Sequence, residues 1–241
     1  MYKNYLFDLY GTLIDIHTDE SKKSLWRGFK NLLAMYGAKY KTKELKNKYS
    51  ELCERERQSV PKEKYTDEPE PELLNVFKAL MKEKGAECSD ELAQFLAAAF
   101  RSMSLKYIKL YDGALDLLRS IKEAGGKVYL LSNAQRSFTE PELRLVGIYD
   151  EFDGIVISSD EGCKKPDIKF YQTILKRYKL KKSDTIMIGN DYITDIKGAN
   201  SAGIASLYLH TNISPDIEGE LLADYRVMDG SLKKVKKILL K

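Results

Sequence analysis

The chain has 241 residues, of which 43% are hydrophobic and 32% are charged, and its formal net charge is +4. This length and apolar content suffice for one large domain or two smaller ones, and the interspersed charges argue against a long disordered tail. The mild positive charge falls short of the basic footprint of nucleic-acid-binding proteins. We therefore expect a small anionic substrate and no nucleic-acid partner.

Cysteines and apolar segments bear on the compartment. Cys53, Cys88 and Cys163 are far apart and form no CxxC pair, which argues against a disulfide framework or a structural zinc site. No apolar run approaches the roughly 18 residues of a membrane span. The N-terminus shows no basic stretch followed by an apolar segment and a cleavage site. We therefore expect a cytoplasmic protein without a signal peptide or a membrane span.

The first predicted strand covers residues 3–8 and is followed by a long segment of helical pattern. Apolar residues recur at helical spacing within 25–36 and again within 92–103, with a loop rich in proline and acidic residues between them. We predict that the segment from Ile16 to Ile108 is helical throughout, without a strand.

From Tyr111 onward, short apolar strands alternate with helices. The predicted strands are 127–133, 154–160, 185–191 and 204–210, and the predicted helices lie near 113–126, 137–146, 168–178 and 193–202. Residues 231–241, with the sequence SLKKVKKILLK, predict a last helix that packs on the body rather than on a membrane surface. This alternation predicts a parallel sheet that is covered on both faces.

We therefore predict an α/β fold, in which residues 1–15 and 109–241 form a Rossmann-like parallel-sheet core. Residues 16–108 would form an all-helical cap domain, inserted after the first strand and placed over the ligand crevice as a lid. Ligands in such folds bind at the carboxyl ends of the strands. Polar residues end several predicted strands, and we expect them to converge on one crevice: Asp8, Ser132, Asn133, Ser158, Ser159, Asp160, Asn190 and Asp191.

Four short motifs at or just after these strand ends resemble those of the haloacid dehalogenase-like (HAD) hydrolase superfamily, in order along nearly the whole chain. They are DLYGT with Asp8, LLSN with Ser132, KKPD with Lys165, and GNDYITDIKGA with Asp195. The resemblance implies that Asp8 is the nucleophile and that the inserted segment is a helical cap of the C1 type. Each motif alone is weak, and only the ordered set is specific.

The residue types agree with that chemistry. A carboxylate becomes an effective nucleophile when a drier crevice and a nearby lysine hold it against an electrophile. Hydroxyl and backbone N–H donors could hold the oxygens of an anionic substrate. The catalytic candidates are Asp8, Tyr10, Thr12, Ser132, Asn133 and Lys165. Several carboxylates at one site repel each other unless a cation compensates, which predicts Mg²⁺ near Asp8, Asp191 and Asp195. The resemblance implies the Tyr10 carbonyl and Asn190 as further candidate metal ligands.

Tyr10 stands where many members of the superfamily have a second aspartate, which protonates the leaving group. Its backbone carbonyl can still bind a metal, but a phenol with a pKa of about 10 is a poor acid near neutral pH. The sequence therefore favours leaving groups that need little protonation, such as acyl phosphates, phosphoanhydrides, aryl phosphates and halides.

Three functions stay open. We favour a Mg²⁺-dependent phosphatase that acts on a small phosphorylated metabolite through an aspartyl-phosphate. A metal-independent 2-haloacid dehalogenase, acting through an aspartyl ester, agrees with Tyr10, Asn133 and Tyr171 but not with Asn190 and Tyr192. A HAD-shaped binding protein with little turnover is the third. The sequence is compatible with a monomer or a homodimer.

Substrate contacts in the cap cannot be read from residue spacing alone. The candidates are Tyr36, Arg55, Arg57 and Tyr65. Arg27 is the candidate for a halide-binding arginine, although it lies closer to Asp8 in the sequence than the equivalent residue of the dehalogenases.

Overall fold

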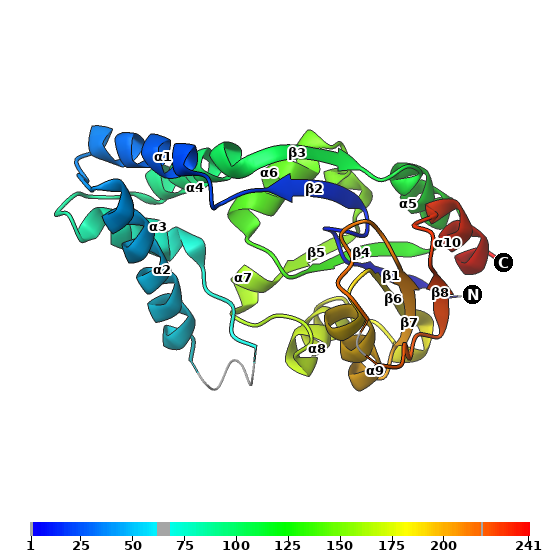
Figure 1. Ribbon diagram of the computed structural model, residues 1–241. Coiled ribbons are helices and arrows are strands. Elements are labelled where there is room, and N and C mark those ends of the chain that lie inside the picture. Colours follow the sequence, from blue (N-terminus) through cyan, green and yellow to red (C-terminus); the bar gives the residue numbers. More distant parts are fainter. Residues whose placement is uncertain (1, 62–67, 218) are drawn as a thin grey trace.

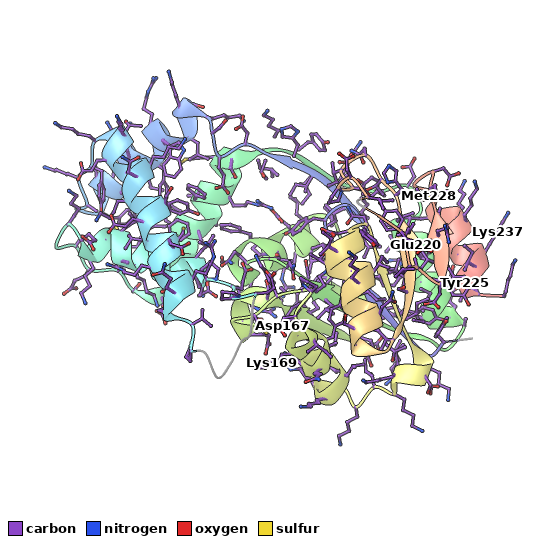
Figure 2. The ribbon with its side chains drawn as sticks, turned by 60° about the horizontal axis from the view of Figure 1, so that its bottom comes forward. Asp167, Lys169, Glu220, Tyr225, Met228 and Lys237 are labelled. Carbon is purple, nitrogen blue, oxygen red and sulfur yellow. The ribbon has the colours of Figure 1, made fainter. Side chains whose placement is uncertain are left out.

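The computed structural model describes residues 2–61, 68–217 and 219–241. It has two bodies joined by a ribbon, with the helices of the inserted segment in one body and the main sheet in the other (Figure 1). Tyr225 and Met228 lie at the end of the core opposite the inserted helices (Figure 2). Among the described residues no helix is long and apolar enough to cross a membrane.

The main sheet of the described chain is parallel and has the strand order β5-β4-β1-β6-β7-β8. Its strands are β1 (Asn4–Phe7), β4 (Lys127–Ser132), β5 (Gly154–Ile157), β6 (Thr185–Gly189), β7 (Ala205–Leu209) and β8 (Tyr225–Val227). The chain runs outward from β1 to β5 on one side and then from β6 to β8 on the other. This reversal beside β1 creates the crevice in which open α/β sheets bind their ligands.

Helices cover both faces of this sheet, as the sequence predicts. The side chains of β1 alternate, so that Tyr5 and Phe7 pack in one apolar cluster and Leu6 in another. The first cluster includes α5 (Ala114–Glu123) and α10 (Leu232–Leu239), and the second includes α8 (Ile168–Arg177) and α9 (Gly198–Ala202). The predicted packing of the last helix on the body is confirmed, because Leu232, Val235 and Leu239 are buried in the first cluster.

The inserted segment builds its own core. Its helices are α1 (Lys23–Met35), α2 (Thr42–Ser59), α3 (Leu73–Lys82) and α4 (Asp90–Ser104). Aromatic rings dominate its centre, where the Phe29 and Phe100 rings meet edge to face with their centroids 5.1 Å apart. Burial of each such ring stabilises the fold by about 1.5–3 kcal/mol. Phe138, on α6 (Arg136–Leu145) of the sheet body, joins this cluster and so ties the two bodies together.

The prediction that residues 16–108 are helical throughout is wrong at both ends. There the chain forms an antiparallel ribbon of β2 (Ile14–Thr18) and β3 (Leu105–Leu110). The two segments that connect the bodies pair with each other, so their backbone N–H and C=O groups form hydrogen bonds. The strands are too short for their alternation to stand out beside long helices. The predicted domain limits, 15/16 and 108/109, cut through this ribbon and stay a prediction.

Two further elements differ from the prediction. The strand predicted at 154–160 ends at Ile157, and the short helix α7 (Ser158–Glu161) follows at once. Strand β8 was not predicted, because it is a short edge strand in which Tyr225 and Arg226 are exposed. The remaining elements are the 3₁₀ turns η1 (Tyr149–Glu151) and η2 (Lys182–Asp184) and the π-helix η3 (Tyr192–Lys197).

Candidate active site

Asp8 follows the last residue of β1, at the reversal point of the sheet, and only 8% of its surface is exposed. Its Oδ1 accepts a hydrogen bond from Lys165 Nζ at 2.7 Å. The chain then turns at Gly11, whose φ of +87° disfavours a side chain, and a Cβ there would overlap the Asn190 amide. This glycine therefore lets the loop after β1 lie directly against the end of β6.

Lys165 is 1% exposed, and its ammonium group lies between two carboxylates. It donates to Asp8 Oδ1 and to Asp195 Oδ1, each at 2.7 Å. Burial alone lowers the pKa of Lys165, but the Asp195 and Asp8 carboxylates outweigh it and raise this pKa above its ordinary value. The lysine therefore stays charged between the two carboxyl groups.

Asn133 fixes the backbone of that lysine. Its Nδ2 donates to the Lys165 carbonyl at 2.9 Å, and its Oδ1 accepts from the Lys165 N–H at 2.8 Å. The Asn133 amide thus contacts both the N–H and the carbonyl of Lys165. We had expected Asn133 to belong to the site, and the structure places it as an orienting contact of Lys165.

Asp195 is fully buried in η3 and has both carboxylate oxygens engaged. Besides the bond to Lys165, its Oδ2 accepts from the Asp191 N–H at 2.9 Å. Burial raises the pKa of Asp195 to about 7, against the Lys165 ammonium, which lowers it. A Cβ at Gly189 would overlap the Asp195 carboxylate, so the last residue of β6 has to be glycine for this placement.

Asp191 and Asn190 hold the loop after β6. Asp191 Oδ1 caps η3 by accepting from the N–H groups of Ile193 at 2.8 Å and Thr194 at 2.9 Å. The buried Thr12 hydroxyl lies 3.2 Å from Asn190 Oδ1 and 3.3 Å from Asp8 Oδ2, and it donates to one of these acceptors. Thr12 is therefore engaged within the protein.

Ser132 differs from Thr12. Its hydroxyl is buried at the end of β4 and has no hydrogen-bond partner among the described residues. A buried hydroxyl without a partner costs free energy unless a ligand or water satisfies it. Ser132 is therefore the predicted site hydroxyl whose hydrogen-bonding capacity is unused among the described residues.

Tyr10 directs its phenol to α6. The hydroxyl donates to Glu142 Oε2 at 2.5 Å and lies 3.0 Å from the Thr139 hydroxyl. Glu142 also accepts from Arg101 Nε of α4 at 2.6 Å. Burial and the neighbouring Glu142 carboxylate raise the pKa of Tyr10 well above its ordinary value, so the phenol is a still weaker acid than in water.

A cavity of about 210 Å³ lies at this end of the sheet. It is lined by Asp8, Tyr10, Asn133, Lys165, Asn190, Asp191, Thr194, Asp195, Ile213 and Pro215. The structure thus brings seven of the residues predicted from the sequence to the cavity, while Thr12 and Ser132 are not among its lining residues. The residues added are Thr194 of η3 and Ile213 and Pro215 of the loop after β7. Drug-sized ligands occupy pockets of about 300–1,000 Å³, so this cavity suits a smaller molecule.

The polar cluster after β5 does not line this cavity. Ser158 Oγ accepts from the Ala134 N–H at 2.8 Å, and Ser159 Oγ accepts from the Arg136 N–H at 3.0 Å. Asp160 pairs with the Arg136 side chain. The expected convergence of Ser158–Asp160 on the crevice is therefore wrong, and these residues hold the turn that leads into α6.

Comparison with known proteins identifies the family of this chain. The sequence profile of the haloacid dehalogenase-like hydrolases matches residues 2–203. The chain belongs to this family. It is 27% identical over 158 residues to the HAD-hydrolase YfnB of Bacillus subtilis, covering 65% of each chain. It is 26% identical over 164 residues to a glyceraldehyde 3-phosphate phosphatase of Methanopyrus kandleri, covering 68% of each chain.

Solved structures of the family share the fold. The magnesium-bound crystal structure of YfnB superposes with a TM-score of 0.57 at 22% identity, covering 100% of this chain and 99% of that one. A 2-haloacid dehalogenase of Pseudomonas syringae superposes with a TM-score of 0.67 at 18% identity, covering 100% of both chains. The HAD fold with its helical cap is therefore common to this chain, to the HAD-hydrolase YfnB and to a 2-haloacid dehalogenase. At these identities the likeness shows the fold alone.

The HAD site offers oxygen donors to a cation. Within the described ranges, no three His, Cys, Asp or Glu side chains gather closely enough to hold a metal by themselves. Mg²⁺ does not require such a cage, because it keeps several waters and binds one or two carboxylates together with substrate phosphate. Asp8 and Asp191 line the cavity and fit that role.

The cap residues proposed as substrate contacts are engaged elsewhere or lie outside the described residues. The Tyr36 ring meets Phe95 at 6.1 Å, and Arg55 Nη1 lies 3.6 Å from Glu83. Arg57 pairs with Glu54, Arg27 is exposed, and Tyr65 is not among the described residues.

One cap arginine, whose guanidinium lies 5.8 Å from the centre of the Tyr10 ring, was not predicted from the sequence. It is Arg101, which pairs with Glu142 and stacks on the Phe138 ring at 5.2 Å. A signal was present in α6, because Phe138, Thr139, Glu142 and Leu143 lie on one buried helical face. A glutamate on such a face indicates a buried partner. The partner lies 41 positions away and cannot be read from spacing.

Proposed function

We propose that this HAD hydrolase is a Mg²⁺-dependent phosphatase for small phosphorylated metabolites with good leaving groups. The observation that carries the proposal is the Lys165 ammonium, held 2.7 Å from both Asp8 and Asp195 at the wall of a 210 Å³ cavity. This arrangement presents one carboxylate nucleophile and a fixed positive charge to an anion of phosphate size.

The reaction follows from the side chains. A carboxylate oxygen of Asp8 attacks phosphorus, the bond to the leaving oxygen breaks, and an aspartyl-phosphate forms on Asp8. Water then hydrolyses this acyl phosphate and regenerates the carboxylate. Lys165 stabilises the oxygens that gain charge, and the partnerless Ser132 hydroxyl can donate to one of them. Bound Mg²⁺ would supply further charge neutralisation between Asp8, Asp191 and the phosphate.

The leaving group must depart with little help. The Tyr10 phenol donates to Glu142 and has a raised pKa, so it cannot replace the missing aspartic acid as a proton donor. Acyl phosphates, phosphoanhydrides and aryl phosphates are therefore favoured over alkyl phosphates. The relatives named phosphatases support the reaction class but not this preference. One of them is a phosphoserine phosphatase of Thermus thermophilus that is 28% identical over 154 residues, and phosphoserine is an alkyl phosphate.

The second candidate is a metal-independent 2-haloacid dehalogenase. Two observations weaken the phosphatase and so keep this candidate open: Asn190 puts a neutral amide where phosphatases most often have a metal-binding acid, and the Asp195 carboxyl group is already engaged by Lys165. In that reaction Asp8 attacks carbon, halide leaves, and water hydrolyses the ester. The presence of both Asp8 and Asp191 at the cavity counts against it, because two carboxyl groups at one site favour a cation. A binding protein with little turnover is the third possibility.

Turnover assays separate these functions. Purified protein is tested on acetyl phosphate, para-nitrophenyl phosphate and L-2-chloropropionate, each with Mg²⁺ and with a chelator, and with Asp8→Asn as the control. Phosphate release that needs both Mg²⁺ and Asp8 supports the phosphatase. Chloride release that is indifferent to the chelator supports the dehalogenase. A protein inactive on all three substrates that still binds phosphate would support the binding protein.

A further inference from the structure

Gln135 is a buried core residue whose side-chain amide forms hydrogen bonds with the cap. It is 8% exposed and stands at the N-cap of α6. Its Oε1 accepts from the Leu73 N–H at 2.9 Å. Its Nε2 donates to Glu70 Oε1 at 2.9 Å and to the Pro71 carbonyl at 2.8 Å. If the cap moved away, this side chain would lose all three partners at once.

The same cap segment also reaches the loop that carries the catalytic lysine. The Lys164 N–H donates to the Glu68 carbonyl, and the Glu70 N–H donates to the Gly162 carbonyl, each at 3.1 Å. Lys164 Nζ lies 3.9 Å from Glu70 Oε2. The cap backbone therefore adds a short antiparallel bridge beside residue 165. Glu70 contacts both this loop and Gln135.

These contacts continue without a gap to the nucleophile. Gln135 stands two residues after Asn133, whose amide binds the Lys165 backbone from both sides. Lys165 follows Lys164 directly and donates to Asp8 at 2.7 Å. The cap thus forms hydrogen bonds with two segments, the turn after β4 and the loop before α8. These two segments determine where the Lys165 ammonium lies.

We propose that Gln135 is a positioning residue, which couples docking of the cap to the placement of Lys165 against Asp8. With the cap docked, Gln135 and Glu70 hold the two segments in register, and the ammonium lies between its carboxylates. When the cap opens, the Gln135 amide loses its partners and the turn that carries Asn133 loosens. Gln135 does not line the active-site cavity, so it acts through Asn133 and Lys165 rather than on the substrate. The catalytic part of this proposal rests on the phosphatase function proposed above.

The test compares Gln135→Met with Gln58→Met, which removes an exposed amide bonded to Glu54 on α2. Small misplacements of a catalytic group cost up to about 100-fold in rate. We therefore expect Gln135→Met to lower kcat on acetyl phosphate roughly 10–100-fold with a smaller change in KM, while Gln58→Met stays within about twofold of wild type. In Glu70→Gln the side-chain oxygen can still accept from Gln135, so kcat should stay near that of wild type. In Glu70→Leu, which has no such oxygen, kcat should fall.

Hydrogen exchange supplies a readout that needs no turnover. Gln135→Met should raise the exchange of the backbone N–H groups of Lys164 and Lys165 while exchange in the centre of the sheet stays unchanged. If this variant does not fold, Leu73→Pro serves instead, because proline is tolerated at the first position of α3 but has no N–H for Gln135. Wild-type exchange at Lys164 and Lys165 in a folded variant would overturn the coupling. Raised exchange in a protein without phosphatase activity would refute the proposed function but not the coupling.

Discussion

The Tyr10 hydroxyl donates a hydrogen bond to the buried carboxylate of Glu142, 132 positions later in the chain. Tyr10, two positions after the proposed nucleophile Asp8, is therefore tied to α6 through its hydroxyl group. Because Arg101 of the cap pairs with the same carboxylate, the contact joins the nucleophile loop, the core helix and the cap. We therefore expect Tyr10 to contribute to stability and not to protonation of the leaving group.

Replacing Tyr10 with phenylalanine should mainly affect stability. The variant loses the hydrogen bond to Glu142 while the ring and the Arg101 pair remain, so we expect the free energy of unfolding to fall by about 1–3 kcal/mol. We expect kcat on acetyl phosphate to stay within about threefold, because the phenol is not the acid. Urea denaturation and steady-state kinetics measure both. The matched control is Tyr111→Phe, whose hydroxyl bonds Asn212. A loss of kcat of about 100-fold at unchanged stability would show that the phenol takes part in the reaction.

Replacing Tyr10 with aspartate should have two opposite effects. The new carboxyl group restores a candidate acid two residues after Asp8, so turnover of alkyl phosphates should rise relative to aryl phosphates. The protein should also become less stable, because the Glu142 bond is lost and a second carboxylate is placed near Glu142. The ratio of kcat/KM on the two substrate types, together with thermal unfolding, tests both effects. An unchanged ratio in a folded variant would mean that Tyr10 is not simply an absent acid.

Replacing Asn133 with alanine should disturb the lysine without touching the nucleophile. Both hydrogen bonds to the Lys165 backbone are lost, and we expect kcat to fall roughly 10–100-fold. Asn75→Ala removes an exposed amide that bonds Glu56 and serves as the control. Activity of Asn133→Ala equal to that of the control would show that Lys165 is held without this amide.

Asp195 should give the stability of the protein a characteristic dependence on pH. Burial raises its pKa from 3.8 to about 7. The folded state therefore binds this proton more tightly than the unfolded chain, and the resulting stabilisation is fully present below 3.8 and is lost as the pH rises to about 7. Asp195→Asn has no such proton. The free energy of unfolding of wild type should thus fall relative to that of Asp195→Asn across this range, as measured by urea denaturation. Parallel pH profiles would contradict the raised pKa.

Much of the site could be predicted from the sequence, because strand ends and motif order are local features. Asp8, Lys165 and Asp195 follow or lie just beyond apolar strands, and parallel strands bring such ends to one edge. Two sets of contacts could not be predicted, namely the hydrogen bonds between Gln135 and the cap and the hydrogen bond between Tyr10 and Glu142. Each joins residues more than 60 positions apart. The ribbon of β2 and β3 was missed for another reason, because its short strands flank long helices whose pattern dominates the segment.

The most direct test of the central claim is to look for the covalent intermediate on Asp8. Wild-type protein is mixed with acetyl phosphate and Mg²⁺, quenched in acid within milliseconds, digested and analysed by mass spectrometry. We predict a phosphoryl adduct on the peptide that contains Asp8, absent from Asp8→Asn and from wild type treated with a chelator. Turnover of acetyl phosphate that depends on Mg²⁺ but continues in Asp8→Asn, with no adduct on this peptide, would contradict the nucleophile assignment.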